Sequence, residues 1–354
     1  MRRSVLAGAT VLAVLGAVVL SAASGCSSSP ASLGHSATDE WPLEVTTLFD
    51  ESAALVRVSD VESLPGGALR AVTSTGAITL GATGAEIRRV VFSPARPWLF
   101  PVRRLLDGSL EYYAGYDDSA DEIVFFDALG KEVVRQPCKW CRDLVVVRVS
   151  AASEALLVRA NDGSKATLFS ARGRERRDFG SPGYLTDVHV ITVAGAPSHT
   201  LVLYFSPDAD SAQAVRLVRL DGTEIARWPV RAGASVGAST AADGRPTIVS
   251  LDGDNLVTWD ALTGKVLSSV AVEHASAFRE VLVQRLSADR RVTVLSGGGS
   301  VDKHIVLVID DTLGRVVFRR IVGRRAWGLA ASRDGRSAFL VASLGRVQRY
   351  TPRL

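Results

Sequence analysis

One unit recurs along most of this chain: an apolar strand with alternating side chains, a tight turn that contains glycine, and a second strand. The turn glycine appears six times, at Gly84, Gly130, Gly173, Gly222, Gly264 and Gly314. The intervals between these glycines are 46, 43, 49, 42 and 50 residues. A period of roughly 40 to 50 residues is typical of a blade of four short strands in a β-propeller. This repeat therefore constrains the fold more than any other feature.

Two further strands fit inside each period. For the first blade we predict strands at Ala54–Val58, Leu69–Thr73, Ile78–Leu80 and Ile87–Phe92. No segment beyond the first 25 residues shows a convincing 3.6-residue apolar period over ten or more positions. The sequence therefore predicts an all-β domain that is essentially free of helices.

The ends of the repeat region predict the number of blades. After Gly314 and the strand Val316–Val322, three strands follow, and the outer strand of this last blade is missing. Upstream of the first blade, Leu43–Phe49 is a strand without a blade. A propeller closes when one terminus donates a strand to the blade begun by the other, which removes the open edge. We therefore predict a seven-bladed β-propeller over residues 43–354, closed by this N-terminal strand.

The first 25 residues have the pattern of an export signal. Arg2 and Arg3 precede an uncharged, small and aliphatic stretch, Val5–Ala23. The tetrapeptide Ala23–Cys26 resembles the bacterial lipobox, which implies that Cys26 is acylated and becomes the mature N-terminus. A plain signal peptide and a retained membrane anchor are the alternatives. All three predict a domain outside the cytoplasm.

Lipidation implies attachment to a bacterial membrane, either the cell membrane or the outer membrane. Acyl chains contribute about 0.8 kcal/mol per buried methylene, so two or three of them anchor a protein firmly. Residues 26–42 then form the lipidated cysteine and a flexible tether rich in serine and alanine. The predicted organisation is a signal peptide at 1–25, this tether, and the propeller.

Two kinds of repeat carry a family resemblance. Leu256–Val266 resembles the quinoprotein-type repeat, with an apolar pair, Asp-Ala and Thr-Gly-Lys, and Phe126–Lys131 resembles a shortened copy. Ser332–Phe339 resembles the turn of WD40-like repeats. The resemblance implies a fold superfamily, and carries no activity with it. It leaves a quinoprotein-like enzyme, with its site in the central channel, as an alternative to a binding module.

The charge balance argues against nucleic acid as a partner. The whole chain carries a formal net charge of +4, and loss of the two arginines in the leader leaves +2. A nearly neutral domain lacks the basic excess that neutralises a phosphate backbone.

Cys138 and Cys141 form the sharpest local motif, Cys-Lys-Trp-Cys. A structural zinc site needs four ligands, and the chain has no second cysteine pair. In an oxidising compartment we expect these two thiols to form a small disulfide ring that fixes a loop. A thiol–disulfide exchange role, favoured by the neighbouring Lys139 and Arg142, and an inert reduced pair are the alternatives.

Arginine pairs recur on or after predicted outer strands, notably Arg88–Arg89 and Arg319–Arg320. Charge on an exposed outer strand blocks pairing between sheet edges. A second interpretation is that these four side chains contact anionic lipid headgroups or an anionic wall polymer.

Other motifs carry less information. Gly233–Gly237 matches the GxSxG nucleophile pattern, but here it would open a β-strand rather than a strand-to-helix turn. Asp252–Asn255 and Asp208–Asp210 lack the glycine and distal glutamate of a calcium loop. The five histidines show no metal-ligand spacing. We therefore name no catalytic residue, no metal site and no cofactor.

Taken together, these patterns predict a membrane-anchored extracytoplasmic lipoprotein. Its propeller would be a monomeric binding or scaffold module for a protein or glycan partner.

Overall fold

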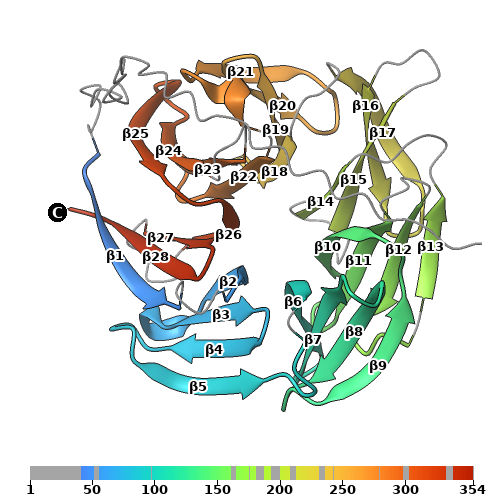
Figure 1. The fold of residues 1–354 in the computed structure, drawn as a ribbon. Helices are drawn as coiled ribbons and strands as arrows, with labels where there is room; N and C mark the ends of the chain where they lie inside the picture. The colour runs from blue at the N-terminus through green and yellow to red at the C-terminus, as the bar shows by residue number, and fades with distance from the viewer. Residues whose placement is uncertain are drawn as a thin grey trace, which may run out of the picture. The chain divides into compact units, whose positions relative to one another are not determined.

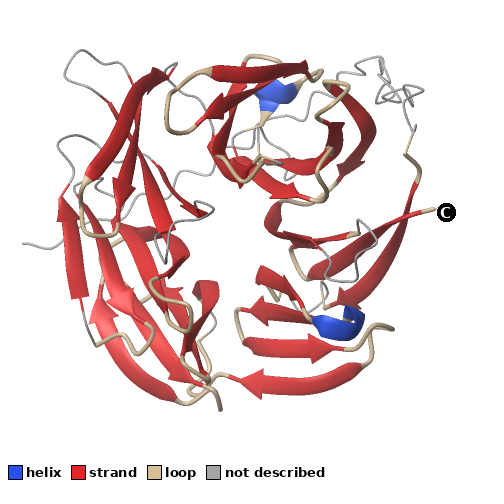
Figure 2. Ribbon diagram, turned by 180° about the vertical axis from the view of Figure 1, so that it is seen from behind, coloured by secondary structure: helices blue, strands red, loops and turns tan. Residues whose placement is uncertain are grey.

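The computed structural model describes residues 41–51, 56–96, 98–160, 165–174, 176–180, 187–192, 200–207, 213–230, 236–241, 243–278, 280–297, 303–331 and 338–353. These residues form seven antiparallel sheets of four strands each, within the single unit Thr38–Leu354. They also include two short 3-10 segments, η2 (Pro65–Gly67) and η3 (Ala275–Ala277), which Figure 2 shows as the only helical turns among them. The predicted seven-bladed all-β propeller is confirmed.

Blades 1 to 3 follow one another along the chain. Blade 1 contains β2 (Val58–Ser63), β3 (Leu69–Thr73), β4 (Gly76–Leu80) and β5 (Glu86–Val91). Blade 2 contains β6 (Leu99–Asp107), β7 (Leu110–Asp117), β8 (Glu122–Asp127) and β9 (Glu132–Pro137). Blade 3 contains β10 (Cys141–Arg148), β11 (Glu154–Ala160), β12 (Lys165–Ser170) and β13 (Arg176–Gly180).

Blades 4 to 6 repeat this order. Blade 4 contains β14 (Asp187–Thr192), β15 (Thr200–Pro207), β16 (Gln213–Arg219) and β17 (Glu224–Val230). Blade 5 contains β18 (Val236–Thr240), β19 (Pro246–Asp252), β20 (Asn255–Asp260) and β21 (Val266–Ala271). Blade 6 contains β22 (Glu280–Arg285), β23 (Arg290–Ser296), β24 (His304–Asp310) and β25 (Arg315–Val322).

Blade 7 is assembled from both ends of the chain. Its strands are β26 (Ala326–Ala331), β27 (Phe339–Ser343), β28 (Arg346–Pro352) and β1 (Leu43–Asp50). β1 pairs antiparallel with β28, with Val45 opposite Tyr350, and the two strands lie side by side in Figure 1. The predicted closing strand, Leu43–Phe49, is therefore confirmed.

The first strand of every blade lies against the first strand of the next one. These contacts run from β2 through β6, β10, β14, β18 and β22 to β26, and β26 in turn contacts β2. The seven inner strands therefore form a closed ring (Figure 1). The six repeat glycines all lie in the turn between the third and fourth strands of their blades, each with a positive φ that a residue with a side chain rarely adopts.

One apolar cluster fills each of the seven interfaces between neighbouring blades. Each sheet is thus covered on both faces, so long stretches of its middle strands are buried: Ile123–Phe126 in β8 is entirely buried, as is β24. The outermost strands are covered less. In β5 only Val90 is buried.

The sequence prediction is wrong for one strand. The first strand of blade 1 was expected at Ala54–Val58, whereas β2 begins at Val58 and ends at Ser63. Val58 and Val61 point into the interface with blade 7, and Asp60 and Glu62 alternate with them. The two acidic residues obscured the alternation that defines this inner strand.

Candidate functional site

The antiparallel order of strands gives the ring two distinct faces. The connections between blades and the turns between second and third strands lie on one side, which we call the connector face. The turns between first and second strands and between third and fourth strands lie on the other side, which we call the hairpin face. The faces differ in the side chains that they present.

Two tryptophans of the connector face project into solvent. Trp98 is 57% exposed and directly precedes β6, the first strand of blade 2. Trp140 is 56% exposed and directly precedes β10, the first strand of blade 3. Both large apolar rings are therefore available to a partner.

The same turn, between β7 and β8 of blade 2, holds both tryptophans. The backbone N–H of Asp118 donates to the carbonyl of Trp98 at 3.4 Å. The backbone N–H of Trp140 donates to the carboxylate Oδ1 of Asp121 at 3.1 Å, and the N–H of Cys138 donates to the carbonyl of Asp121 at 2.8 Å. Hydrogen bonds thus tie two connections that are far apart in sequence to one turn.

A buried tyrosine supports this turn from below. The hydroxyl of Tyr116 donates to Oδ1 of Asp121 at 2.7 Å. This bond, followed by the N–H of Trp140 and the charge of Lys139, lowers the pKa of Asp121 below its usual value. Burial and the neighbouring Asp121 raise the pKa of Tyr116. Asp121 is therefore a carboxylate at neutral pH, and Tyr116 remains its donor.

A disulfide between Cys138 and Cys141 closes the loop that carries Trp140. The predicted disulfide is therefore present in the structure. Asp121 and Trp140 both have a φ of +53°, the left-handed region that non-glycine residues seldom adopt. The covalent ring and the hydrogen bonds to Asp121 compensate for this conformation.

Four side chains form a row at the connector-face end of the inner strands. The rings of Phe100 in β6 and Trp327 in β26 contact edge to face at 4.8 Å between centroids. The guanidinium of Arg57 lies over Phe100 at 5.4 Å, and that of Arg325 lies over Trp327 at 4.2 Å. Burial lowers the pKa of Arg325, which also pairs with Glu280. These contacts link blades 6, 7, 1 and 2 at the connector-face end of their inner strands.

An ion-pair network lies toward the hairpin face between blades 1 and 2. Glu111 pairs with Arg70 and Arg104 at 2.9 Å each, and both arginines also reach Glu62 at 3.2 Å. Burial raises the pKa of Glu111, but the two arginines outweigh it and leave that pKa below its usual value. The two arginines and the two glutamates of this network therefore neutralise one another's charge.

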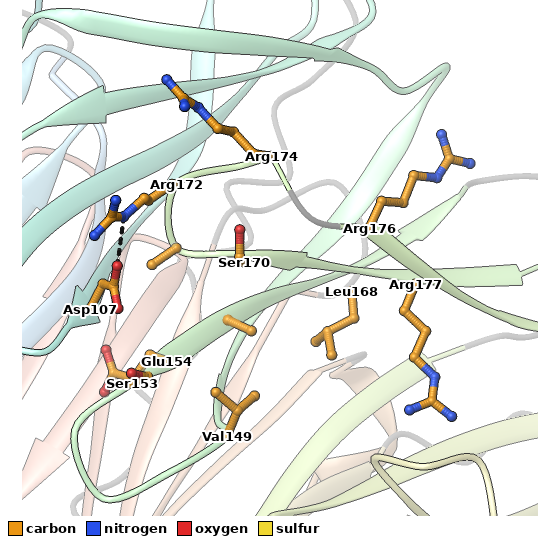
Figure 3. Close-up of a pocket in the computed structure, with 12 residues that line it drawn as sticks. Asp107, Val149, Ser153, Glu154, Leu168, Ser170, Arg172, Arg174, Arg176 and Arg177 are labelled. Atoms are coloured by element: carbon orange, nitrogen blue, oxygen red, sulfur yellow. Dashed lines mark hydrogen bonds and ion pairs between the residues drawn. The ribbon is translucent and has the colours of Figure 1, made fainter.

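A pocket of about 590 Å³ opens on the hairpin face of blade 3. Figure 3 shows arginines from the β12–β13 turn and the start of β13 around it. Arg172 pairs with Asp107 at 2.7 Å, Arg176 pairs with Asp178 at 3.0 Å, and Arg177 donates to the carbonyl of Asp221. The labelled guanidinium groups point in different directions, so they do not converge on one point (Figure 3).

The arginine pairs singled out from the sequence lie on two separate outer strands, β5 and β25, and blade 7 intervenes. Arg88 donates to the carbonyl of Ala128, and Arg89 pairs with Glu86 and Glu51. Arg319 pairs with Glu273, and Arg320 is exposed. The fold does not bring these four side chains together.

Other sequence motifs give no composite site in the part of the chain that the structure describes. Cys26, Asp208–Asp210 and Gly233–Ser235 lie outside the described residues. Asp252–Asn255 forms the hairpin between β19 and β20. Within the described ranges, no three His, Cys, Asp or Glu side chains group as metal ligands, and no helix is long and apolar enough to cross a membrane.

Sequence reasoning did not single out Trp98 as a candidate and treated Trp140 only as part of the cysteine motif. A signal was present: the two tryptophans are 42 residues apart, one blade period, and each precedes an inner strand. Equivalent positions in consecutive blades lie side by side on the same face of a propeller.

Comparisons with known proteins bear on the fold alone. A catalytically inactive variant of virginiamycin B lyase from Staphylococcus aureus, solved with quinupristin, has a TM-score of 0.58 and 9% identity, covering 88% of this chain and 99% of that one. KlHsv2 with its loop 6CD replaced by a Gly-Ser linker has a TM-score of 0.56 and 12% identity, covering 82% and 90%. No protein-family model and no curated protein sequence matches the chain. At such low identities, these likenesses support the propeller and no shared activity.

Proposed function

We propose that this chain is a membrane-anchored extracytoplasmic lipoprotein whose propeller binds a protein or glycan partner through the connector face of blade 2. The observation that supports this binding face is the exposure of Trp98 and Trp140 on either side of one turn. Cys26 would carry the lipid, and residues 27–40 would hold the ring away from the bilayer.

Two exposed tryptophans whose backbone is held in place are good candidates for residues that contact a partner. A solvated indole forgoes the burial that stabilises most tryptophans, and tryptophan is enriched among the residues that dominate binding energy. Here a disulfide and Asp121 hold the backbone of Trp140 in one conformation. A preorganised side chain loses less entropy when a partner binds. The loop thus has the properties of a binding element.

The binding face can be tested by photocrosslinking in the cells that make the protein. A benzophenone amino acid at position 98 or 140 should give crosslinked adducts, because the partner covers these side chains. Leu129 and Leu313, which are 81% and 57% exposed in turns of the hairpin face, provide matched control positions. Adducts at the control positions alone would contradict the proposed face.

The anchor is tested separately by cell fractionation. The wild-type protein should partition with membranes and incorporate a labelled fatty acid, whereas Cys26→Ala should do neither. A variant that stays in the membrane fraction, with its leader uncut, would favour the retained anchor over lipidation.

A further inference from the structure

The surface between the two exposed tryptophans combines aromatic and acidic groups. We call the group of Trp98, Asp118, Lys139 and Trp140 the tryptophan patch. Asp118 is exposed at the start of the turn that holds both tryptophans, and it makes no ion pair with any described residue. The patch therefore offers two exposed indole rings beside one turn and, on that turn, a carboxylate that forms no ion pair with the described residues.

Such a combination suits a ligand that is flat and apolar on its faces and rich in hydroxyl donors at its edge. The C–H groups on one face of a pyranose ring pack against an indole ring, because the indole face is electron-rich and apolar. A carboxylate accepts hydrogen bonds from hydroxyl groups, and bonds to a charged acceptor are stronger than neutral ones. From these contacts we infer that the tryptophan patch binds a glycan, an inference that rests on the proposed function.

Lys139 argues against a cationic protein segment as the ligand. Its Nζ lies 4.8 Å from the centroid of the Trp140 ring, so an internal cation already occupies one face of that ring. A lysine or arginine from a partner could not occupy that face of the ring, and the charge of Lys139 offsets the attraction that Asp118 would exert on it. A neutral sugar ring carries no charge to be repelled, and Trp140 is 56% exposed, which leaves ring surface for it to contact.

The support beneath the patch fits this role. Tyr116 and the disulfide fix the loop backbone through Asp121 and the two cysteines, while the indole ring stays outside the core. Rigid aromatic rings presented in this way bind with a small loss of conformational entropy. A single contact between a sugar and an aromatic ring is weak, so affinity rises when two indole rings contact the same glycan.

The test uses the full chain purified in detergent, with cellohexaose and the hexamer of β-1,4-linked N-acetylglucosamine as probes. Binding is measured by calorimetry and by protection of tryptophan fluorescence from acrylamide quenching. At least one hexasaccharide should bind, and Trp98→Ala and Trp140→Ala should each weaken it by about tenfold. Asp118→Asn should weaken it less, whereas Leu129→Ala and Leu313→Ala should leave it unchanged.

A cationic decapeptide of lysine serves as the competing class of ligand, and it should not bind. Failure of both sugars to bind a folded chain, or retention of binding in Trp98→Ala and Trp140→Ala, overturns the glycan assignment. If protein adducts nevertheless form at positions 98 and 140 in cells, the proposed binding function stands with a protein partner. If neither sugars bind nor adducts form, both proposals fail together.

Discussion

Blades 7 and 2 each bury a tyrosine, but the two side chains make different contacts. Tyr350 in β28 is fully buried and stacks on Phe339 at 4.8 Å between ring centroids, and its hydroxyl has no hydrogen-bond partner among the described residues. Tyr116 in β7 is 4% exposed, and its hydroxyl donates to Asp121. The first tyrosine contributes apolar packing alone, and the second also contributes a polar bond.

Blade 7 closes the ring, whereas blade 2 presents a surface, and the two roles use different kinds of contact. Blade 7 joins the first and last strands of the propeller, and it does so with backbone pairing and an apolar cluster shared with blade 6. Blade 2 is packed on both faces, yet its connector-face turn forms a polar network around Asp121 that fixes the backbone of the exposed Trp140. Burial is not directional, whereas hydrogen bonds are, so only the second arrangement can orient Trp140.

The largest effect should come from blade 7. Phe339→Ala removes a fully buried ring from the closing blade, and we expect a loss of about 3–5 kcal/mol in the free energy of unfolding. Urea denaturation followed by circular dichroism measures this loss. Leu313→Ala, an exposed position, is the control and should change stability by less than about 0.5 kcal/mol. A loss near the control value would mean that ring closure does not depend on this cluster.

The disulfide of blades 2 and 3 should matter less for stability. Replacing both Cys138 and Cys141 by alanine should cost about 2 kcal/mol, because the closed loop is short. Trp140 should become more accessible to acrylamide quenching at the same time. Reduction of the wild-type protein with dithiothreitol should reproduce both changes, and an unchanged quenching rate would show that Asp121 alone holds the loop.

Removing each tyrosine hydroxyl should give effects of opposite sign. Tyr116→Phe breaks the bond to the charged Asp121 and should cost about 1.5 kcal/mol. Tyr350→Phe removes a buried hydroxyl that has no partner in the described part of the chain and should raise stability by about 1 kcal/mol. Differential scanning calorimetry of the two variants gives the comparison directly. Equal losses in both would mean that the two hydroxyls are equally satisfied.

The smallest effect concerns alkaline pH. Burial raises the pKa of Tyr350 to about 12, above the value of about 10 that an unfolded tyrosine has. The contribution of Tyr350 is therefore fully present below pH 10 and is lost as the pH rises toward 12, because only the unfolded chain ionises there. Unfolding measured at pH 8 and pH 10.5 should show this loss, and Tyr350→Phe should reduce it. A slope identical to that of the wild type would exclude Tyr350 as its source.

Much of the fold could be predicted because it is encoded by local repetition. The glycine of each third-to-fourth strand turn, and the incomplete last blade with its spare N-terminal strand, are visible in the sequence. The first strand of blade 1 was misplaced because Asp60 and Glu62 interrupt its apolar pattern. The disulfide was also predictable, because only two cysteines lie near each other.

The candidate site was much harder to predict. Trp98 and Asp121 lie in loops with no motif, and their importance comes from contact between segments that are separated along the chain. The arginine pairs were conspicuous in sequence, yet β5 and β25 carry them to different parts of the rim. Spacing along the chain cannot show which loops of neighbouring blades will meet.

The sequence by itself determined the blade and its period, since both follow from alternation and turn chemistry within about 45 residues. Counting strands over the whole repeat region then showed the need for a closing strand. Only the tertiary structure decided which tryptophans stay exposed and which tyrosine hydroxyl finds a partner. Those outcomes depend on the β7–β8 turn meeting the connections on both sides of it. Packing between blades brings these groups together, and no local pattern encodes it.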